Sequence, residues 1–192
     1  GEQQKCVQSN LNSPMKCVEL IDNRSCFVYN KAKTSYWRVI QMYLKRKVDA
    51  FLEEWKADKN RKPLIVKGSR QIGKTESILH FAADHYENVI EINFVRDEKY
   101  KGIITDGYEA TDIIKNISLI DPTKKFVPEK TLIFFDEITE FPEIATSLKF
   151  FCIDGRFDVI CSGSMLGVNY KKIESNSVGY KKDYEDRKST RL

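Results

Sequence analysis

The sequence contains one stretch that strongly restricts what the chain can fold into, a glycine-containing loop after a short apolar run. The stretch follows residues 64–66 and fits the pattern G-x-x-x-x-G-K-[ST] at every fixed position. Its residues are Gly68, Ser69, Arg70, Gln71, Ile72, Gly73, Lys74 and Thr75. Such a loop needs a strand before it and a helix after it, and the flanking sequence indicates both. We therefore expect an α/β fold built around loop 68–75.

The chemistry of phosphate binding explains the spacing of this pattern. The two glycines let the backbone curl, so that consecutive N–H groups point inward and attract an anion. A helix that begins near Gly73 adds the positive end of its dipole. We expect Lys74 to reach the β- and γ-phosphates of a nucleotide, and the Thr75 hydroxyl to hold Mg²⁺. An ordinary glycine turn is the alternative, and the strand–loop–helix context argues against it.

The composition is that of a globular chain with 192 residues, of which 31% are charged and 41% hydrophobic. No apolar run approaches the ~18 residues that cross a bilayer, so we expect no membrane association. The formal net charge of +4 is concentrated near the ends, and residues 42–185 carry a net charge of −1. Because this central part has no basic stripe, the sequence does not favour a nucleic-acid partner there.

The cysteines indicate the redox compartment. None of the five cysteines forms a C-x-x-C pair, which argues against a zinc site. An odd number of cysteines without a disulfide framework is typical of reduced thiols. We therefore expect a cytoplasmic location.

Helical and strand patterns alternate along the central part of the chain. Helical periodicity predicts helices over 42–58, from loop 68–75 to 86, over 110–120 and over 142–152. Apolar runs predict strands over 64–67, 89–94, 131–135 and 157–161, and an incomplete edge strand over 178–184. Alternation of this kind predicts right-handed crossovers and a parallel sheet flanked by helices.

Polar side chains follow two of these strands, where ligands bind in open α/β sheets. Asp136 comes directly after strand 131–135, and we expect it to hold Mg²⁺ opposite Thr75 through water. Glu137 follows, where a carboxylate can orient or deprotonate an attacking water. Ser162 follows strand 157–161 and is expected to sense the γ-phosphate or position that water; the alternative is a hydroxyl that closes a turn. Lys74, Glu137 and Ser162 are thus the predicted catalytic residues.

Residues 42–185 resemble the N-terminal module of a prokaryotic ATPase family of the AAA+ superfamily. The resemblance rests on the runs PLIVKGSRQIGKTESIL, TLIFFDEITEFPEIATSLKFF and DGRFDVICSGSMLGVNY. It implies a three-layer P-loop NTPase fold, ATP as the nucleotide, and homo-oligomers in which an arginine reaches across a subunit interface. Arg70 and Arg156 are the candidates for that arginine. Members often have Gln where this chain has Thr139, and they continue into a further C-terminal domain.

The two ends of the chain differ from its centre. Residues 1–41 show no sustained periodicity and are predicted to be a poorly structured arm, either one that folds on a partner or translated upstream sequence before a start at Met42. Residues 186–192 resemble a translated sequencing adapter, so we expect an artefactual tail and native sequence up to Glu185.

The leading interpretation is an ATPase that uses Mg²⁺ to hydrolyse ATP and drive a conformational change. One alternative is a nucleotide-dependent binding switch with little hydrolysis of its own. A P-loop kinase is less favoured, because Asp136 and Glu137 suit water activation and the sequence shows no arginine-rich lid. A GTPase is disfavoured because the guanine signature N-K-x-D is absent. The sequence names no client protein or nucleic acid.

Overall fold

The computed structural model describes residues 18–22, 25–28, 39–41, 43, 45–164, 173 and 177–186, and it divides into the units Gly1–Lys45 and Arg46–Leu192. The first unit contains an antiparallel sheet in the order β1-β2-β3. Its strands are β1 (Val18–Asp22), β2 (Ser25–Val28) and β3 (Val39–Gln41). The sequence patterns predicted no strand in this region. Whether residues 1–41 are an arm that folds on a partner or translated upstream sequence stays a prediction.

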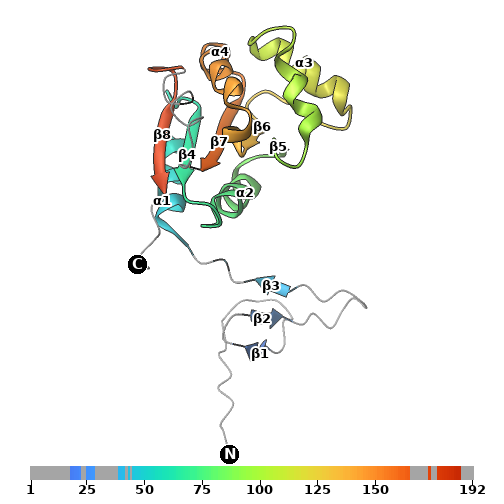
Figure 1. The fold of residues 1–192 in the computed structure, drawn as a ribbon. Helices are drawn as coiled ribbons and strands as arrows, with labels where there is room; N and C mark the ends of the chain where they lie inside the picture. Colours follow the sequence, from blue (N-terminus) through green and yellow to red (C-terminus); the bar gives the residue numbers. More distant parts are fainter. Residues whose placement is uncertain are drawn as a thin grey trace, which may run out of the picture. The chain divides into compact units, whose positions relative to one another are not determined.

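The second unit contains a five-stranded sheet in the order β5-β6-β7-β4-β8, whose strands lie side by side in Figure 1. The strands are β4 (Leu64–Gly68), β5 (Asn88–Asn93), β6 (Thr131–Asp136), β7 (Asp158–Ser164) and β8 (Lys182–Asp186). Every pairing between neighbours is parallel, which confirms the predicted sheet. The edge strand is shifted from the predicted 178–184, and its last residue, Asp186, belongs to the segment predicted as a tail.

Four α-helices of the described residues accompany this sheet: α1 (Lys47–Ala57), α2 (Lys74–His85), α3 (Ala110–Ile120) and α4 (Ser147–Asp154). Short 3₁₀ segments are η1 (Glu98–Ile104), η2 (Ile138–Glu140) and η3 (Pro142–Thr146). The single helix predicted over 142–152 is therefore divided. The Ser147 hydroxyl donates to the Ile144 carbonyl over 2.7 Å, and such a local bond competes with regular α-helical pairing.

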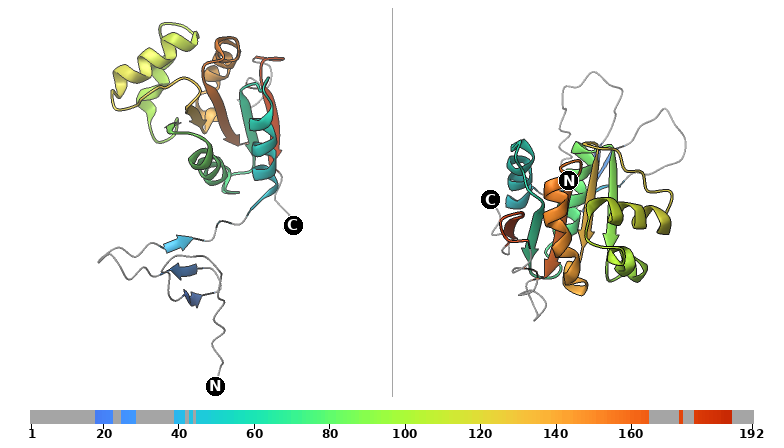
Figure 2. Two further views of the ribbon diagram at one scale, coloured as in Figure 1. Left: turned by 180° about the vertical axis from the view of Figure 1, so that it is seen from behind. Right: turned by 90° about the horizontal axis from the view of Figure 1, so that it is seen from above.

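The helices cover the two faces of the sheet as separate layers. Alternate residues of β6 show this division, since Leu132 and Phe134 pack with α1 and α2, whereas Ile133 and Phe135 pack with α3 and α4. Seen from behind, α1 lies in front of β4 and β8 (Figure 2). The two apolar clusters are fully separated by the sheet, which confirms the predicted three-layer α/β architecture.

Strand order and register determine which side chains meet at the carboxyl edge of the sheet. Strand β7 lies between β4 and β6. In the register, Gly68 is opposite Ser164 and Asp186, and Asn93 is opposite Asp136. The ends of all five strands therefore lie at one edge, where loop 68–75 also begins. Within the described residues, none of the helices has the length and apolar character needed to cross a bilayer.

Candidate functional site: the carboxyl edge of the five-stranded sheet

Loop 68–75 has the backbone geometry that its glycines predict. Gly73 has φ +80° and Gln71 has φ +60°, so the chain turns through the left-handed region twice before α2 begins. A Cβ at Gly68 would lie 2.6 Å from both the Asp186 carbonyl oxygen and Ile72 Cδ1, so the close approach of these groups requires glycine. Among the described residues, no side chain caps the N-terminus of α2. Its first N–H groups and its dipole are thus directed at the loop, as anion binding requires.

The side chain of Lys74 is folded into this loop. Only 5% of the residue is exposed, and Nζ donates to the carbonyl oxygens of Gly68 at 3.2 Å and Ser69 at 2.8 Å. Burial lowers the pKa of Lys74, while the carboxylates of Glu137 and Asp136 act in the opposite direction. The ammonium group is therefore held by the loop carbonyls and is influenced electrostatically by the carboxylates at the end of β6.

Asp136 is the centre of a hydrogen-bonded cluster and is 3% exposed. Its carboxylate accepts bonds from the Thr75 hydroxyl at 3.2 and 3.3 Å, from Asn93 Nδ2 at 2.8 Å and from the Ser162 hydroxyl. The backbone N–H of Glu137 donates to the same carboxylate over 3.1 Å. The structure thus brings together both predicted metal ligands and the predicted catalytic Ser162. Ser162 contacts Asp136 in this arrangement, and its role towards phosphate stays a prediction.

Glu137 differs from Asp136 in having a carboxylate oxygen that makes no hydrogen bond to the described residues. Its backbone lies in the left-handed region at φ +54°, which is uncommon for a residue with a side chain. Its Oε2 atom is buried and has no hydrogen-bond partner among the described residues. Buried carboxylate oxygens normally have partners, so this atom indicates a place for a ligand or a water.

The donor set fits Mg²⁺ bound with nucleotide phosphates. Mg²⁺ prefers oxygen ligands and is usually held by one or two protein groups together with phosphate oxygens and water. The Thr75 hydroxyl and the Asp136 carboxylate supply such oxygens beside a loop suited to phosphate. The unengaged Oε2 of Glu137 leaves an acceptor for a water next to them. These residues therefore fit both groups that the sequence predicts, Mg²⁺ and a nucleotide.

Sequence reasoning assigned no role to Asn93, which the structure places in this cluster. Its side-chain oxygen accepts the N–H groups of Val95 at 3.0 Å and Arg96 at 2.9 Å, so its amide nitrogen faces Asp136. The position at the end of a predicted strand was the available signal. That signal did not reveal that β5 pairs with β6 in the register that sets Asn93 opposite Asp136.

Sequence reasoning also assigned no role to Arg46, which directly precedes α1. Its Nη2 lies 2.6 Å from Asp186 Oδ2, and its Nη1 donates to the Ser77 hydroxyl over 3.2 Å. Ser77 lies in the first part of α2, just after the loop. Because Arg46 and Asp186 are separated by 140 residues, no local pattern could have found this pair.

Each of the two candidates for an arginine that reaches a neighbouring subunit pairs within its own chain. Arg70 lies 3.6 Å from Glu140, and both side chains are largely exposed. Arg156 bonds Asp154 over 2.8 Å. Arg156 precedes β7, so it lies at the amino edge of the sheet, away from loop 68–75. Whether either residue acts across an interface stays a prediction.

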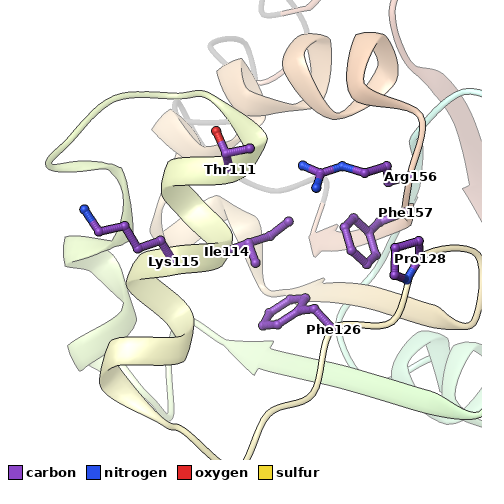
Figure 3. A pocket seen from close by; sticks show the side chains of 7 residues that line it. All are labelled: Thr111, Ile114, Lys115, Phe126, Pro128, Arg156 and Phe157. Atoms are coloured by element: carbon purple, nitrogen blue, oxygen red, sulfur yellow. The ribbon is translucent and has the colours of Figure 1, made fainter.

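A cavity of about 280 Å³ lies near this amino edge, and Figure 3 shows its apolar and aromatic lining. It is lined by Thr111, Ile114, Lys115, Phe126, Pro128, Arg156 and Phe157. The rings of Phe126 and Phe157 meet edge to face, with centroids 6.0 Å apart. Because Pro128 and Phe157 precede β6 and β7, this cavity is distinct from the cluster around Asp136.

Comparison with known proteins gives a family match and several structural likenesses. A family model described as an AAA domain matches residues 60–186. Similar solved structures include C. elegans PCH-2 (TM-score 0.40, 12% identity, 73% of this chain and 42% of that chain) and Hsp104 with ATPγS and FITC-casein (0.47, 16%, 73% and 26%). A third is the Aeropyrum pernix Orc1 protein in complex with DNA (0.41, 11%, 73% and 46%). The chain thus spans less than half of each of these chains. No curated protein matches the sequence.

Proposed function

We propose that this chain, which belongs to the AAA domain family, binds ATP with Mg²⁺ at loop 68–75 and hydrolyses it to drive a conformational change. One observation carries the proposal. Asp136 accepts a hydrogen bond from Thr75 beside the loop, while the neighbouring Glu137 keeps a buried oxygen that has no partner within the described part of the chain. One carboxylate is thus engaged with the predicted metal ligand, and the other is available to a water.

In this proposal, some residues of the site bind phosphate and metal, and one residue transfers a proton. Lys74 and the N–H groups at the start of α2 bind the phosphates, and the Thr75 hydroxyl and Asp136 hold the metal. Bound Mg²⁺ supplies charge neutralisation at the phosphate oxygens. Glu137 Oε2 orients the attacking water and accepts its proton. Ser162 keeps Asp136 oriented through its hydrogen bond and is proposed to respond to the γ-phosphate.

The proposal extends to assembly and location. A cytoplasmic homo-oligomer is proposed, in which an arginine of a neighbouring copy approaches the γ-phosphate. Arg70 and Arg156, whose side chains are exposed, are the candidates for this arginine. An arginine supplied in this way increases hydrolysis by about 10³–10⁵-fold in related systems. Slow turnover by an isolated copy is therefore expected.

Two substitutions test the proposal. Lys74→Ala is expected to lose Mg-ATP binding, measured by titration with a fluorescent ATP analogue in parallel with GTP. Glu137→Gln is expected to keep ATP binding and to lower turnover by about 10²–10⁴-fold, because the general base is removed. Glu143→Gln, at an exposed position in η3, is the matched control and should leave both quantities unchanged.

Two outcomes of these measurements would contradict the residue assignments. If Lys74→Ala binds Mg-ATP as tightly as the wild type, the assignment of loop 68–75 is wrong. If the wild type binds ATP and Glu137→Gln turns it over at the wild-type rate, the hydrolytic role of Glu137 is wrong.

A further inference from the structure

We propose that Arg46 is a second cation of the nucleotide site, with Asp186 as its counter-ion until nucleotide phosphate takes the place of that carboxylate. The inference rests on the proposed function and adds a phosphate-binding residue to it. Arg46 lies outside loop 68–75, directly before α1. Its contacts, its counter-ion and the charge balance around Lys74 each support the assignment.

The guanidinium of Arg46 lies against the loop. A Cβ added to Gly73 would be 3.1 Å from Arg46 Nη1, so the glycine leaves the space that the guanidinium occupies. The same nitrogen donates to the Ser77 hydroxyl on α2 over 3.2 Å. Gly73 is the residue before α2, where N–H groups and the helix dipole attract an anion. Arg46 therefore brings a full positive charge to the helix end that is suited to phosphate.

The partner of Arg46 in this structure is a buried carboxylate. The Asp186 side chain is 3% exposed, and its Oδ2 lies 2.6 Å from Arg46 Nη2. Burial raises the pKa of Asp186, and Arg46 opposes that effect. A poorly solvated carboxylate contributes less as a partner than its short distance suggests, because burial of an ion offsets much of the attraction. An incoming phosphate oxygen can therefore compete for the same guanidinium.

The charges around Lys74 favour such an exchange. Glu137, Asp136 and Asp186 act on Lys74 as negative neighbours, and Arg46 acts as a positive one. Three carboxylates thus face two cations, an arrangement that repels a polyphosphate. Bound Mg²⁺ would neutralise the charge of Asp136, and transfer of Arg46 from Asp186 to phosphate would place the positive charge of Arg46 against the phosphate oxygens. An arginine suits this role, because its planar guanidinium can bond two oxygens at once.

Nucleotide titration tests the exchange. Fluorescent analogues of ATP and ADP are titrated in the presence of Mg²⁺ against the wild type, Arg46→Ala, Arg46→Lys, Asp186→Asn and Lys74→Ala. Arg46→Ala is expected to raise the Kd for both nucleotides by about tenfold or more, since charged hydrogen bonds are lost. Arg46→Lys keeps the charge and should recover part of the affinity. Asp186→Asn should bind at least as tightly as the wild type, because Arg46 is released from its counter-ion.

Arg61→Ala is the matched control, because it also removes an arginine–aspartate ion pair. Arg61 lies 2.7 Å from Asp158, a distance similar to that between Arg46 and Asp186. Arg61 precedes β4 and Asp158 begins β7, so this pair is at the amino edge of the sheet. Both alanine variants are expected to lower the melting temperature without nucleotide. Only Arg46→Ala should also reduce the rise in melting temperature that ATP produces. Should Arg46→Ala fail to fold, Arg46→Lys and Asp186→Asn carry the test through their opposite effects on affinity.

The outcomes distinguish this inference from the proposed function. If Lys74→Ala loses binding while Arg46→Ala and Arg46→Lys bind within twofold of the wild type, the role of Arg46 is wrong and the nucleotide site stands. If Asp186→Asn weakens binding as much as Arg46→Ala, the pair is a structural clamp and the exchange is wrong. If the wild type binds no nucleotide, the proposed function itself fails.

Discussion

The Thr75 hydroxyl lies 3.2 Å from Oδ2 of Asp136, although 61 residues separate them in the chain. Thr75 is in the first turn of α2, and Asp136 is the last residue of β6, so the bond joins a helix start to a strand end. Both groups converge on one point at the carboxyl edge of the sheet. The protein therefore brings these two oxygen groups together through its own fold.

Substitution of Asp136 by Asn should separate metal binding from nucleotide binding. The amide keeps the size of the side chain and loses the charge that attracts Mg²⁺. We expect ATP affinity measured in EDTA to change little, and the gain in affinity on adding Mg²⁺ to fall by at least about tenfold. Asp106→Asn, at an exposed position, is the control. An unchanged gain with Mg²⁺ would contradict the assignment of Asp136.

Turnover should be sensitive to a negative charge introduced at position 93. Asn93→Ala removes one donor to Asp136 and the acceptor for two N–H groups, which should cost about 1–3 kcal/mol of unfolding free energy. Asn93→Asp keeps that acceptor and sets a second carboxylate opposite Asp136, so we expect it to reduce Mg-ATP turnover more than Asn93→Ala does. Urea denaturation and turnover assays measure the two effects.

Asn88→Ala, at the other end of β5, is the control for these variants and should leave turnover unchanged. Equal turnover in Asn93→Asp and the wild type would show that Asn93 does not influence Asp136.

Gly68 and Gly102 provide a matched pair of glycines. Gly68→Ala would bring a methyl group to 2.6 Å from the Asp186 carbonyl oxygen and from Ile72 Cδ1, whereas a Cβ at Gly102 meets no atom within 4 Å. We expect Gly68→Ala to lower the unfolding free energy by about 1–3 kcal/mol and to weaken ATP binding, because loop 68–75 must shift. Gly102→Ala should stay within about 0.5 kcal/mol of the wild type. Equal stability of the two variants would argue against the close approach at Gly68.

Asp158 should make stability depend on pH. Burial acts to raise the pKa of Asp158, but hydrogen bonds from Arg61, Lys56 and Tyr86 hold it below its usual value. A carboxyl with a lowered pKa stabilises the folded state above its unfolded pKa of about 3.9. This stabilisation is lost as the pH falls through the lower pKa of the folded state.

Asp158→Asn should therefore lower the unfolding free energy at pH 7 by about 1–3 kcal/mol, because the partly buried Lys56 and Arg61 lose a charged hydrogen-bond partner. Urea denaturation between about pH 6 and pH 3 should show a smaller loss of stability in Asp158→Asn than in the wild type. Asp154→Asn, which removes the surface pair with Arg156, is the control and should follow the wild-type profile. Parallel pH profiles for wild type and Asp158→Asn would contradict this role.

The central elements could be predicted because their signals are local. Helix α3 has the predicted bounds, and β6 differs from its prediction by one residue, since an apolar run or a helical period lies within the element itself. Boundaries shifted where side-chain hydrogen bonds compete with the backbone, as at Ser147. The short antiparallel strands before residue 42 gave no lasting alternation and were not predicted.

The candidate site could be predicted in part for the same reason. Loop 68–75 and Asp136 carry motifs, and strand ends of a parallel sheet meet at one edge, so their proximity follows from the pattern. Asn93 and Arg46 carry no motif. Their roles depend on the register of β5 with β6 and on where α1 begins relative to α2, and those relations arise only from packing.

The position of β7 between β4 and β6 sets the width and the direction of the site. Neighbouring strands lie about 4.8 Å apart, so the ends of β4 and β6 are separated by about 10 Å, room for a phosphate group and a hydrated cation. Each strand also adds about 20–25° of twist, which turns the end of β6 by about 40–50° relative to that of β4. Substitutions that flatten β7 would therefore misalign loop 68–75 and Asp136, which lie at the ends of the two neighbouring strands. The alignment of the site thus depends on β7, which contacts Asp136 through the hydroxyl of Ser162.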